Sequence, residues 1–185
     1  MGSLRHGFKR IESLLFQMKD IVWIEIGVYK GETAEYVLRN FDVQRIYLID
    51  PYTPLPYFKR YFGTAEIVDA SKREAHARLR EHEDRTVFLE DFSENVCDEI
   101  PDGSCSVLFI DGNHHYESVL ADLNNFVPKV KSGGLIIGDD LDEPGVEEAI
   151  AEYVKAQGIS YEVENVKGRT SKFFFRVAAE NHKEE

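Results

Sequence analysis

The stretch Trp23–Gly31 constrains the fold of this chain more than any other part of the sequence. It begins inside an apolar, largely β-branched run, Ile21–Ile26, which is typical of a parallel strand covered on both faces. Gly27 and Gly31 follow, and glycine permits both a sharp turn and a close approach of a ligand to the backbone. Residues 32–40 then carry apolar side chains at helical spacing. This order predicts a strand, a glycine turn and a helix whose first N–H groups face the turn, where a carboxylate or ribose oxygen could accept them.

The glycine turn alone does not identify a ligand. Its G-x-x-x-G spacing differs from the dinucleotide-binding pattern and lacks the Lys-Ser/Thr ending of a phosphate loop, so a purely structural turn is an equal alternative. A second strand, residues 45–50, ends in Asp50. Nucleoside-binding α/β folds place a ribose-binding acid roughly 20 residues past such a turn. The two features together favour a nucleoside site.

Length and charge limit the class of protein. With 185 residues, 43% of them hydrophobic, the chain is expected to form one domain over residues 1–185. A formal charge of −12 disfavours binding to nucleic acid or to anionic membrane surfaces. Cys97 and Cys105 show neither zinc-site spacing nor a disulfide framework, which indicates reduced thiols and a cytoplasmic protein. We expect neither a signal peptide nor a membrane-spanning segment.

Strands and helices alternate along the remaining chain. Further strands are expected at residues 86–89, 106–111 and 135–138, with a closing hairpin of residues 161–166 and 172–177; helices are expected at residues 3–19, 65–83, 94–99, 116–127 and 143–157. Residues 51–63, rich in proline and aromatics, form either a packed aromatic cluster or a lid, and residues 179–185 are expected to fray. The order predicts a Rossmann-like, doubly wound α/β fold with a mostly parallel seven-stranded sheet, a C-terminal β-hairpin and helices on both faces.

Carboxylates end most of these strands. In an open parallel sheet the carboxyl ends of the strands share one edge, where such folds bind ligands. A row of acids there is energetically costly unless a cation or hydrogen-bond donors stabilise their negative charge. Asp91 has a local alternative, as part of a turn in which Ser93 caps the next helix. The acids at this edge are Glu25, Asp50, Asp91, Asp111, Asp139 and Asp140.

These motifs resemble the class I S-adenosylmethionine-dependent methyltransferases over roughly residues 10–177. Glu25-Ile-Gly27-Val-Tyr-Lys-Gly31 resembles their first motif, and Asp50 resembles their ribose-binding acid. Ile110-Asp111-Gly112, with Gly133-Gly134 leading to Asp139-Asp140, is similar to their fourth and fifth strands. Within the superfamily the likeness is greatest to small-molecule O-methyltransferases, including those that modify macrolide and aminocoumarin sugars.

The resemblance implies a cofactor site for S-adenosylmethionine. Asp50 would accept hydrogen bonds from both ribose hydroxyls. The turn residues Gly27, Tyr29 and Gly31 would contact the methionine part, with Glu25 behind them, while Asp91 and Phe92 would frame the adenine; Asp111 would also face the cofactor.

The resemblance also implies a metal. Asp111, Asp139 and Asp140 would end neighbouring strands, and three hard oxygen ligands suit Mg²⁺, which would orient a substrate hydroxyl and lower its pKa. The alternative is that Asp139 or Asp140 caps the helix starting near Glu143. His114 or His115 could act as a general base, because an imidazole titrates near neutral pH, and either could instead be a solvated loop residue, which is the interpretation preferred for His115.

The expected function is methyl transfer from S-adenosylmethionine to a hydroxyl of a small-molecule acceptor, with Asp111 and His114 as catalytic residues. Two alternatives keep the same fold: an aminopropyltransferase and a non-catalytic nucleoside-binding domain. Short chains of this kind often borrow a neighbouring subunit to complete the site, so a homodimer is a further expectation.

Overall fold

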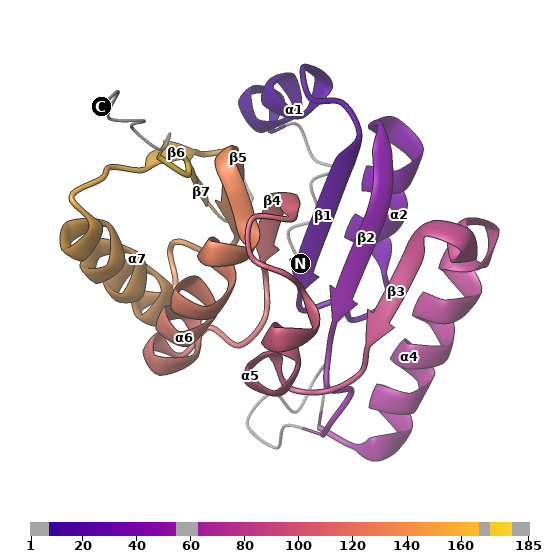
Figure 1. Cartoon of the computed structure of the whole chain (residues 1–185). Coiled ribbons are helices and arrows are strands. Elements are labelled where there is room, and N and C mark those ends of the chain that lie inside the picture. Colours follow the sequence, from indigo (N-terminus) through magenta and orange to yellow (C-terminus); the bar gives the residue numbers. More distant parts are fainter. Residues whose placement is uncertain (1–7, 55–62, 167–170, 179–185) are drawn as a thin grey trace.

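The computed structural model describes residues 8–54, 63–166 and 171–178, and these form a sheet with helices on both faces (Figure 1). The strands are β1 (Ile21–Ile26), β2 (Val43–Ile49), β3 (Thr86–Leu89), β4 (Cys105–Ile110), β5 (Val130–Gly138), β6 (Glu162–Glu164) and β7 (Lys172–Arg176). The helices are α1 (Lys9–Phe16), α2 (Glu32–Asn40), α4 (Ala65–Leu79), α5 (Ser93–Val96), α6 (Tyr116–Phe126) and α7 (Pro144–Gln157), with short 3-10 turns η3 (Arg80–Arg85), η4 (Cys97–Glu99) and η5 (Val127–Lys129).

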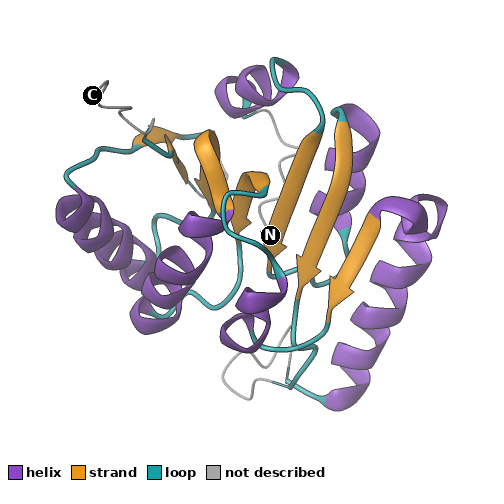
Figure 2. Ribbon diagram, viewed as in Figure 1, coloured by secondary structure: helices purple, strands orange, loops and turns teal. Residues whose placement is uncertain are grey.

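The seven strands lie in the order β3, β2, β1, β4, β5, β7, β6. The pairs from β3 through β5 are all parallel, and β7 is antiparallel to both β5 and β6. This confirms the predicted mostly parallel sheet with a C-terminal hairpin (Figure 2). Because β1 to β5 run in one direction, their carboxyl ends all lie at the same edge of the sheet.

Two apolar layers hold the helices to the sheet. On one face of the sheet, Ile24, Leu108 and Ile136 pack against α5, α6 and α7. On the other face, Trp23, Phe109 and neighbouring strand residues pack against α1, α2 and α4. Alternate residues of a strand point to opposite faces. Glu25 and Asp111 therefore share the face of Trp23 and Phe109, which is the face covered by α1, α2 and α4.

Several element boundaries differ from the prediction. Helix α1 ends at Phe16 rather than at residue 19, because the chain turns at Asp20, with φ 47°, into β1; residues 1–7 lie outside the described part. Helix α4 ends at Leu79 and continues as η3. Strand β5 includes Gly133 and Gly134, expected as a turn, because their N–H and C=O bond to Val177.

Three expected segments lie wholly or partly outside the described residues. Residues 55–62 of the possible lid and residues 179–185 of the expected tail lie outside the described residues, as does Gly168 of the expected hairpin turn. Within the described ranges, no helix combines the length and the apolarity that crossing a bilayer would require.

Candidate active site

The glycine turn after β1 is fixed by its neighbours on both sides. Gly27 has φ 88°, and a β-carbon there would lie 2.1 Å from the carbonyl oxygen of Asp111, so only glycine fits. Gly31 has φ 70° and is the N-cap of α2, with no side chain capping the helix. The N-terminus of α2 therefore opens onto the turn, where its dipole favours an anionic group such as a carboxylate.

Asp50 holds the turn through backbone hydrogen bonds. Its Oδ2 accepts the N–H groups of Val28 and Tyr29 at 3.0 and 2.9 Å, and its Oδ1 accepts that of Tyr52 at 2.8 Å. Burial raises the pKa of this carboxyl, and the three N–H donors lower it in part. A carboxylate offers about four acceptor positions. Three are thus occupied and one remains for a ligand, whereas the predicted bonds to both ribose hydroxyls would need two; that role of Asp50 stays a prediction.

Backbone strain gathers at the same edge. Tyr29, Tyr52 and Asp140 all have positive φ, at 52°, 43° and 51°. For a bulky residue such as tyrosine this conformation is uncommon, and it is found more often at ligand sites than elsewhere. Tyr29 was predicted to lie in the turn, whereas Tyr52 was predicted only as one of the aromatic residues of the segment 51–63, either a packed cluster or a lid.

Tyr52 and Glu25 each bury a polar atom that no described residue satisfies. The Tyr52 hydroxyl and Glu25 Oε2 have no hydrogen-bond partner within residues 8–54, 63–166 and 171–178. Glu25 is only 1% exposed. Burial, and then the charge of Asp111, raise the pKa of its carboxyl well above the ordinary value. Burial also raises the pKa of the Tyr52 hydroxyl, with Asp50 and Glu25 adding to the effect. Unsatisfied buried groups of this kind are costly and favour a ligand that supplies their partners.

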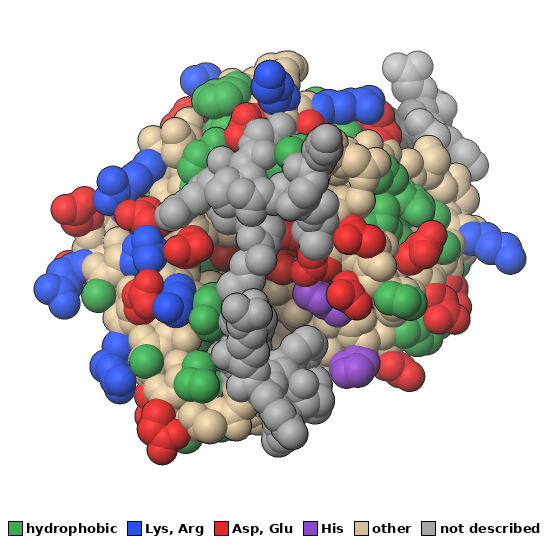
Figure 3. Space-filling model, turned by 180° about the vertical axis from the view of Figure 1, so that it is seen from behind, with side chains coloured by type: hydrophobic (Ala, Val, Ile, Leu, Met, Phe, Trp, Pro, Cys, Tyr) green, Lys and Arg blue, Asp and Glu red, His purple; other side chains and the backbone are tan. Residues whose placement is uncertain are grey.

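Asp111, His114 and Asp140 form one cluster at the ends of β4 and β5. Their candidate ligand atoms lie within 4.8 Å of one another, with His114 Nε2 at 3.4 Å from Asp140 Oδ2 and 3.7 Å from Asp111 Oδ1. Burial lowers the pKa of His114, but Asp111, Asp140 and Asp139 outweigh that effect and raise it above its ordinary value. Burial raises the pKa of Asp111. Figure 3 shows acidic and histidine side chains together near the centre of the rear face.

Asp139 lies in a different environment from Asp140. Its side chain is fully buried in an ion pair with Lys172, while Asp111 and Asp140 bring their carboxylates to His114. The structure therefore does not bring together the three predicted metal ligands as one cluster. Neither acid caps α7, because the N-cap of that helix is Glu143.

The remaining predicted residues lie after β3. Asp91 Oδ1 accepts the Phe92 N–H at 2.7 Å and Asn95 Nδ2 at 2.9 Å, which lowers its pKa and matches the local turn alternative. The Phe92 ring is 42% exposed and available for contact with a flat ligand. Ser93 was predicted to cap α5, which is wrong: Phe92 is the N-cap, and the Ser93 hydroxyl donates to Asp122 instead. His115 is exposed, as expected.

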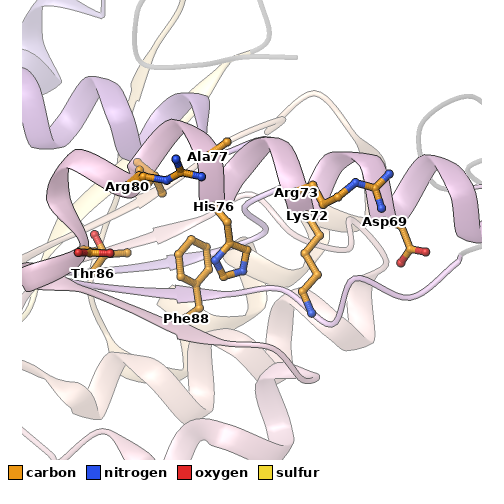
Figure 4. A pocket seen from close by; sticks show the side chains of 10 residues that line it. Asp69, Lys72, Arg73, His76, Ala77, Arg80, Thr86 and Phe88 are labelled. Atoms are coloured by element: carbon orange, nitrogen blue, oxygen red, sulfur yellow. The ribbon is translucent and has the colours of Figure 1, made fainter.

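A separate cavity of about 810 Å³ lies between α4 and β3 (Figure 4). Lys72 and His76 of α4 and Phe88 of β3 are among the side chains that line it. The His76 ring stacks on Phe88, with ring centroids 3.9 Å apart. None of the strand-end acids that meet at the glycine turn or at the Asp111 cluster lines this cavity, so it is not the site described above.

Comparison with known proteins identifies the family. Residues 24–141 match the model of a methyltransferase domain. An uncharacterised protein of Acanthamoeba polyphaga mimivirus is 28% identical over 68% of this chain, and the chain spans only 53% of that relative's length. The 8-demethyl-8-(2,3-dimethoxy-alpha-L-rhamnosyl)-tetracenomycin-C 4'-O-methyltransferase of Streptomyces olivaceus is 23% identical, with 94% of this chain and 75% of the relative covered.

A solved structure shows the same fold. The O-methyltransferase TomG from Streptomyces achromogenes, solved in complex with S-adenosylmethionine, superposes with a TM-score of 0.68 at 14% identity, covering 93% of this chain and 79% of TomG. The matched family model includes the glycine turn, Asp50 and the Asp111–Asp140 region. The chain therefore belongs to the methyltransferase-domain family, and its fold is that of the class I S-adenosylmethionine-dependent O-methyltransferases.

Proposed function

We propose that the protein transfers the methyl group of S-adenosylmethionine to a hydroxyl group of a small-molecule acceptor. The observation that carries this proposal is the buried Glu25 carboxyl, with Oε2 lacking a partner in the described chain, directly behind the Gly27 turn and beside Asp111. A cofactor with a cationic sulfonium and ammonium would supply positive charge there. The open N-terminus of α2 suits its carboxylate.

Different residues of the described chain would contact different parts of the cofactor. Asp50 has one acceptor position left for a ribose hydroxyl after its three backbone bonds. Gly27 and Tyr29 bring backbone close to the methionine part, and the exposed Phe92 ring provides a face for the adenine. Asp91 contributes to the adenine site by holding the backbone at Phe92.

Asp111 and His114 are the proposed catalytic pair. His114 Nε2 would take the proton from the acceptor hydroxyl, and S-adenosylmethionine, when bound, would supply the methyl group to that oxygen and leave as S-adenosylhomocysteine. In the ligand-free protein the neighbouring carboxylates favour the imidazolium. A cationic cofactor reduces that preference, so the imidazole becomes a base when the site is filled. Asp111 Oδ1 lies 3.7 Å from the same nitrogen, and its charge stabilises the imidazolium that forms.

The cluster also fits a divalent cation. Donor atoms of Asp111, His114 and Asp140 within 4.8 Å of one another match the span of ligands around one ion, and the carboxylate oxygens suit Mg²⁺, the ion expected from the sequence. When bound, such a cation would lower the pKa of an acceptor hydroxyl. Asp111 and Asp140 are the residues that would hold it.

The test combines cofactor binding with turnover. S-adenosylhomocysteine should bind the purified protein by isothermal titration and should bind at least tenfold more weakly to Asp50→Ala, which loses the acceptor that fixes the turn. S-adenosylmethionine with a panel of hydroxylated small molecules should then yield S-adenosylhomocysteine. His114→Ala should abolish that product, whereas His115→Ala, the neighbouring exposed histidine, should retain it.

The alternatives give different results. Cofactor binding with no methylated product from any acceptor would favour the non-catalytic nucleoside-binding domain. Failure of the folded protein to bind either nucleoside would contradict the proposal.

A further inference from the structure

Lys172 is a fully buried lysine beside the strand-end acids. Lysine is almost never fully buried unless it is paired. Its Nζ forms an ion pair with Asp139 Oδ2, and neither side chain has any exposed surface. The rings of Phe8 and Phe109 lie over the ammonium group, with their centroids 4.6 and 5.3 Å from Nζ. The ammonium group is thus enclosed by the Asp139 carboxylate and by two aromatic rings.

The sheet topology brings Lys172 to this place. Strand β7 is antiparallel to β5 with Gly138 opposite Phe173, so Lys172 lies next to Asp139. It shares the sheet face of Phe174 and Phe109, the face that α1 covers. Breaking a buried pair by removing one partner leaves an uncompensated charge, which is strongly unfavourable. Asp139 therefore has a fixed counter-ion from a strand at the far end of the chain.

Both oxygens of Asp139 are engaged. Oδ1 accepts the N–H of Asp140 at 2.8 Å, and Oδ2 faces Lys172. In contrast, the side chains of Asp111 and Asp140 are 25% and 17% exposed. Access and pairing therefore separate Asp139 from the other two acids.

We propose that Lys172 is a positioning residue that holds Asp139 as an internal ion pair, so that Asp111 and Asp140, without Asp139, supply the carboxylates of the cation site. The inference rests on the cation in the proposed function. It changes the ligand set expected from the sequence, in which all three acids bind the metal. Lys172 also offsets the negative charge of Asp139, which reduces the net negative charge of the strand-end acids beside the proposed cofactor site.

Mn²⁺ binding tests this inference directly, with free Mn²⁺ followed by electron paramagnetic resonance. The double variant Lys172→Met/Asp139→Asn, which removes both charges of the pair, should bind Mn²⁺ within about threefold of the wild-type protein, whereas Asp140→Asn should bind at least about tenfold more weakly. Lys172→Met should bind about tenfold more tightly, because a carboxylate that has lost its ammonium partner becomes available to the cation. The double variant Lys172→Met/Asp139→Asn should lose that gain. Asp142→Asn serves as the control for removing a nearby acid.

Tighter binding is the result that a merely structural lysine would not produce, since destabilisation alone would weaken the site. If Lys172→Met does not fold, as judged by circular dichroism, the comparison of the double variant Lys172→Met/Asp139→Asn with Asp140→Asn decides. Equal losses in these two variants would overturn the inference. So would the absence of Mn²⁺ binding in both the wild-type protein and Lys172→Met. A parallel titration with S-adenosylhomocysteine separates either result from failure of the proposed methyltransferase function, which would abolish nucleoside binding.

Discussion

Asp122 makes the stability of the protein depend on pH. It lies on α6, is 4% exposed, and accepts one hydrogen bond from the Ser93 hydroxyl at 2.5 Å. Burial raises the pKa of its carboxyl from 3.8 to about 7. Between these values the native protein holds a proton that the unfolded chain has lost. The free energy of unfolding therefore falls as pH rises through this window and levels off above pH 7.

The size of the effect follows from the shift. Each pKa unit corresponds to about 1.36 kcal/mol, so between pH 5 and pH 8 the wild-type protein should lose about 3 kcal/mol of stability through this group. Asp122→Asn keeps an acceptor for Ser93 but cannot ionise. Its stability relative to the wild-type protein should therefore rise by about 3 kcal/mol over the same interval.

Urea denaturation of both proteins at pH 5, 6, 7 and 8 measures this difference. Asp98→Asn, which replaces an exposed acid near α5, is the matched control and should show no such change with pH. A difference between Asp122→Asn and the wild-type protein that stays constant from pH 5 to pH 8 would show that the carboxyl is already ionised in the native state, and would refute the reasoning.

Three further substitutions test the turn, the histidine loop and the N-terminal helix. Gly27→Ala places a β-carbon 2.1 Å from the Asp111 carbonyl oxygen at φ 88°; we expect a loss of at least about 2 kcal/mol in urea denaturation and no binding of S-adenosylhomocysteine by calorimetry. Gly145→Ala places a β-carbon 2.4 Å from the carbonyl oxygen of His114, so turnover should fall about a hundredfold while nucleoside binding persists. Unchanged turnover would show that the histidine loop can move without cost. Glu164→Ala removes the carboxylate that accepts the Arg10 and Ile11 N–H groups at 2.9 and 3.0 Å. The free energy that protects the α1 amides from hydrogen exchange should fall by about 1 kcal/mol, and the α7 amides serve as the internal reference.

The fold was predictable because each strand carries its own local signal. Runs such as Ile21–Ile26 and Cys105–Ile110 are buried along nearly their full length, and such runs separated by helical segments indicate a parallel sheet. The boundaries were less predictable, since they depend on contacts made across the chain. Strand β5 begins at Val130, which pairs with Cys105 of β4, and it includes Gly133 and Gly134, which bond to Val177, more than forty residues later in the sequence.

The site was predictable in outline for the same reason, and its details were not. A strand that ends in an acid is visible in the sequence, so Asp50 and Asp111 could be placed at the ligand edge. Backbone donors carry no sequence signal, however, so the occupation of Asp50 by Val28 and Tyr29 N–H groups could not be foreseen. It leaves fewer acceptor positions on this carboxylate for a ligand.

Asp139 and Asp140 show how two identical neighbours acquire different roles. Asp139 continues the alternation of β5, so its side chain enters the buried layer that contains Ile137 and meets Lys172. Asp140 follows the end of the strand and adopts φ 51°, a conformation that aspartate tolerates better than most residues, and its carboxylate lies beside His114. A single backbone turn thus separates a structural ion pair from the cluster of Asp111, His114 and Asp140. The pair of letters in the sequence cannot reveal that division, because it depends on where β5 ends and on a lysine from β7.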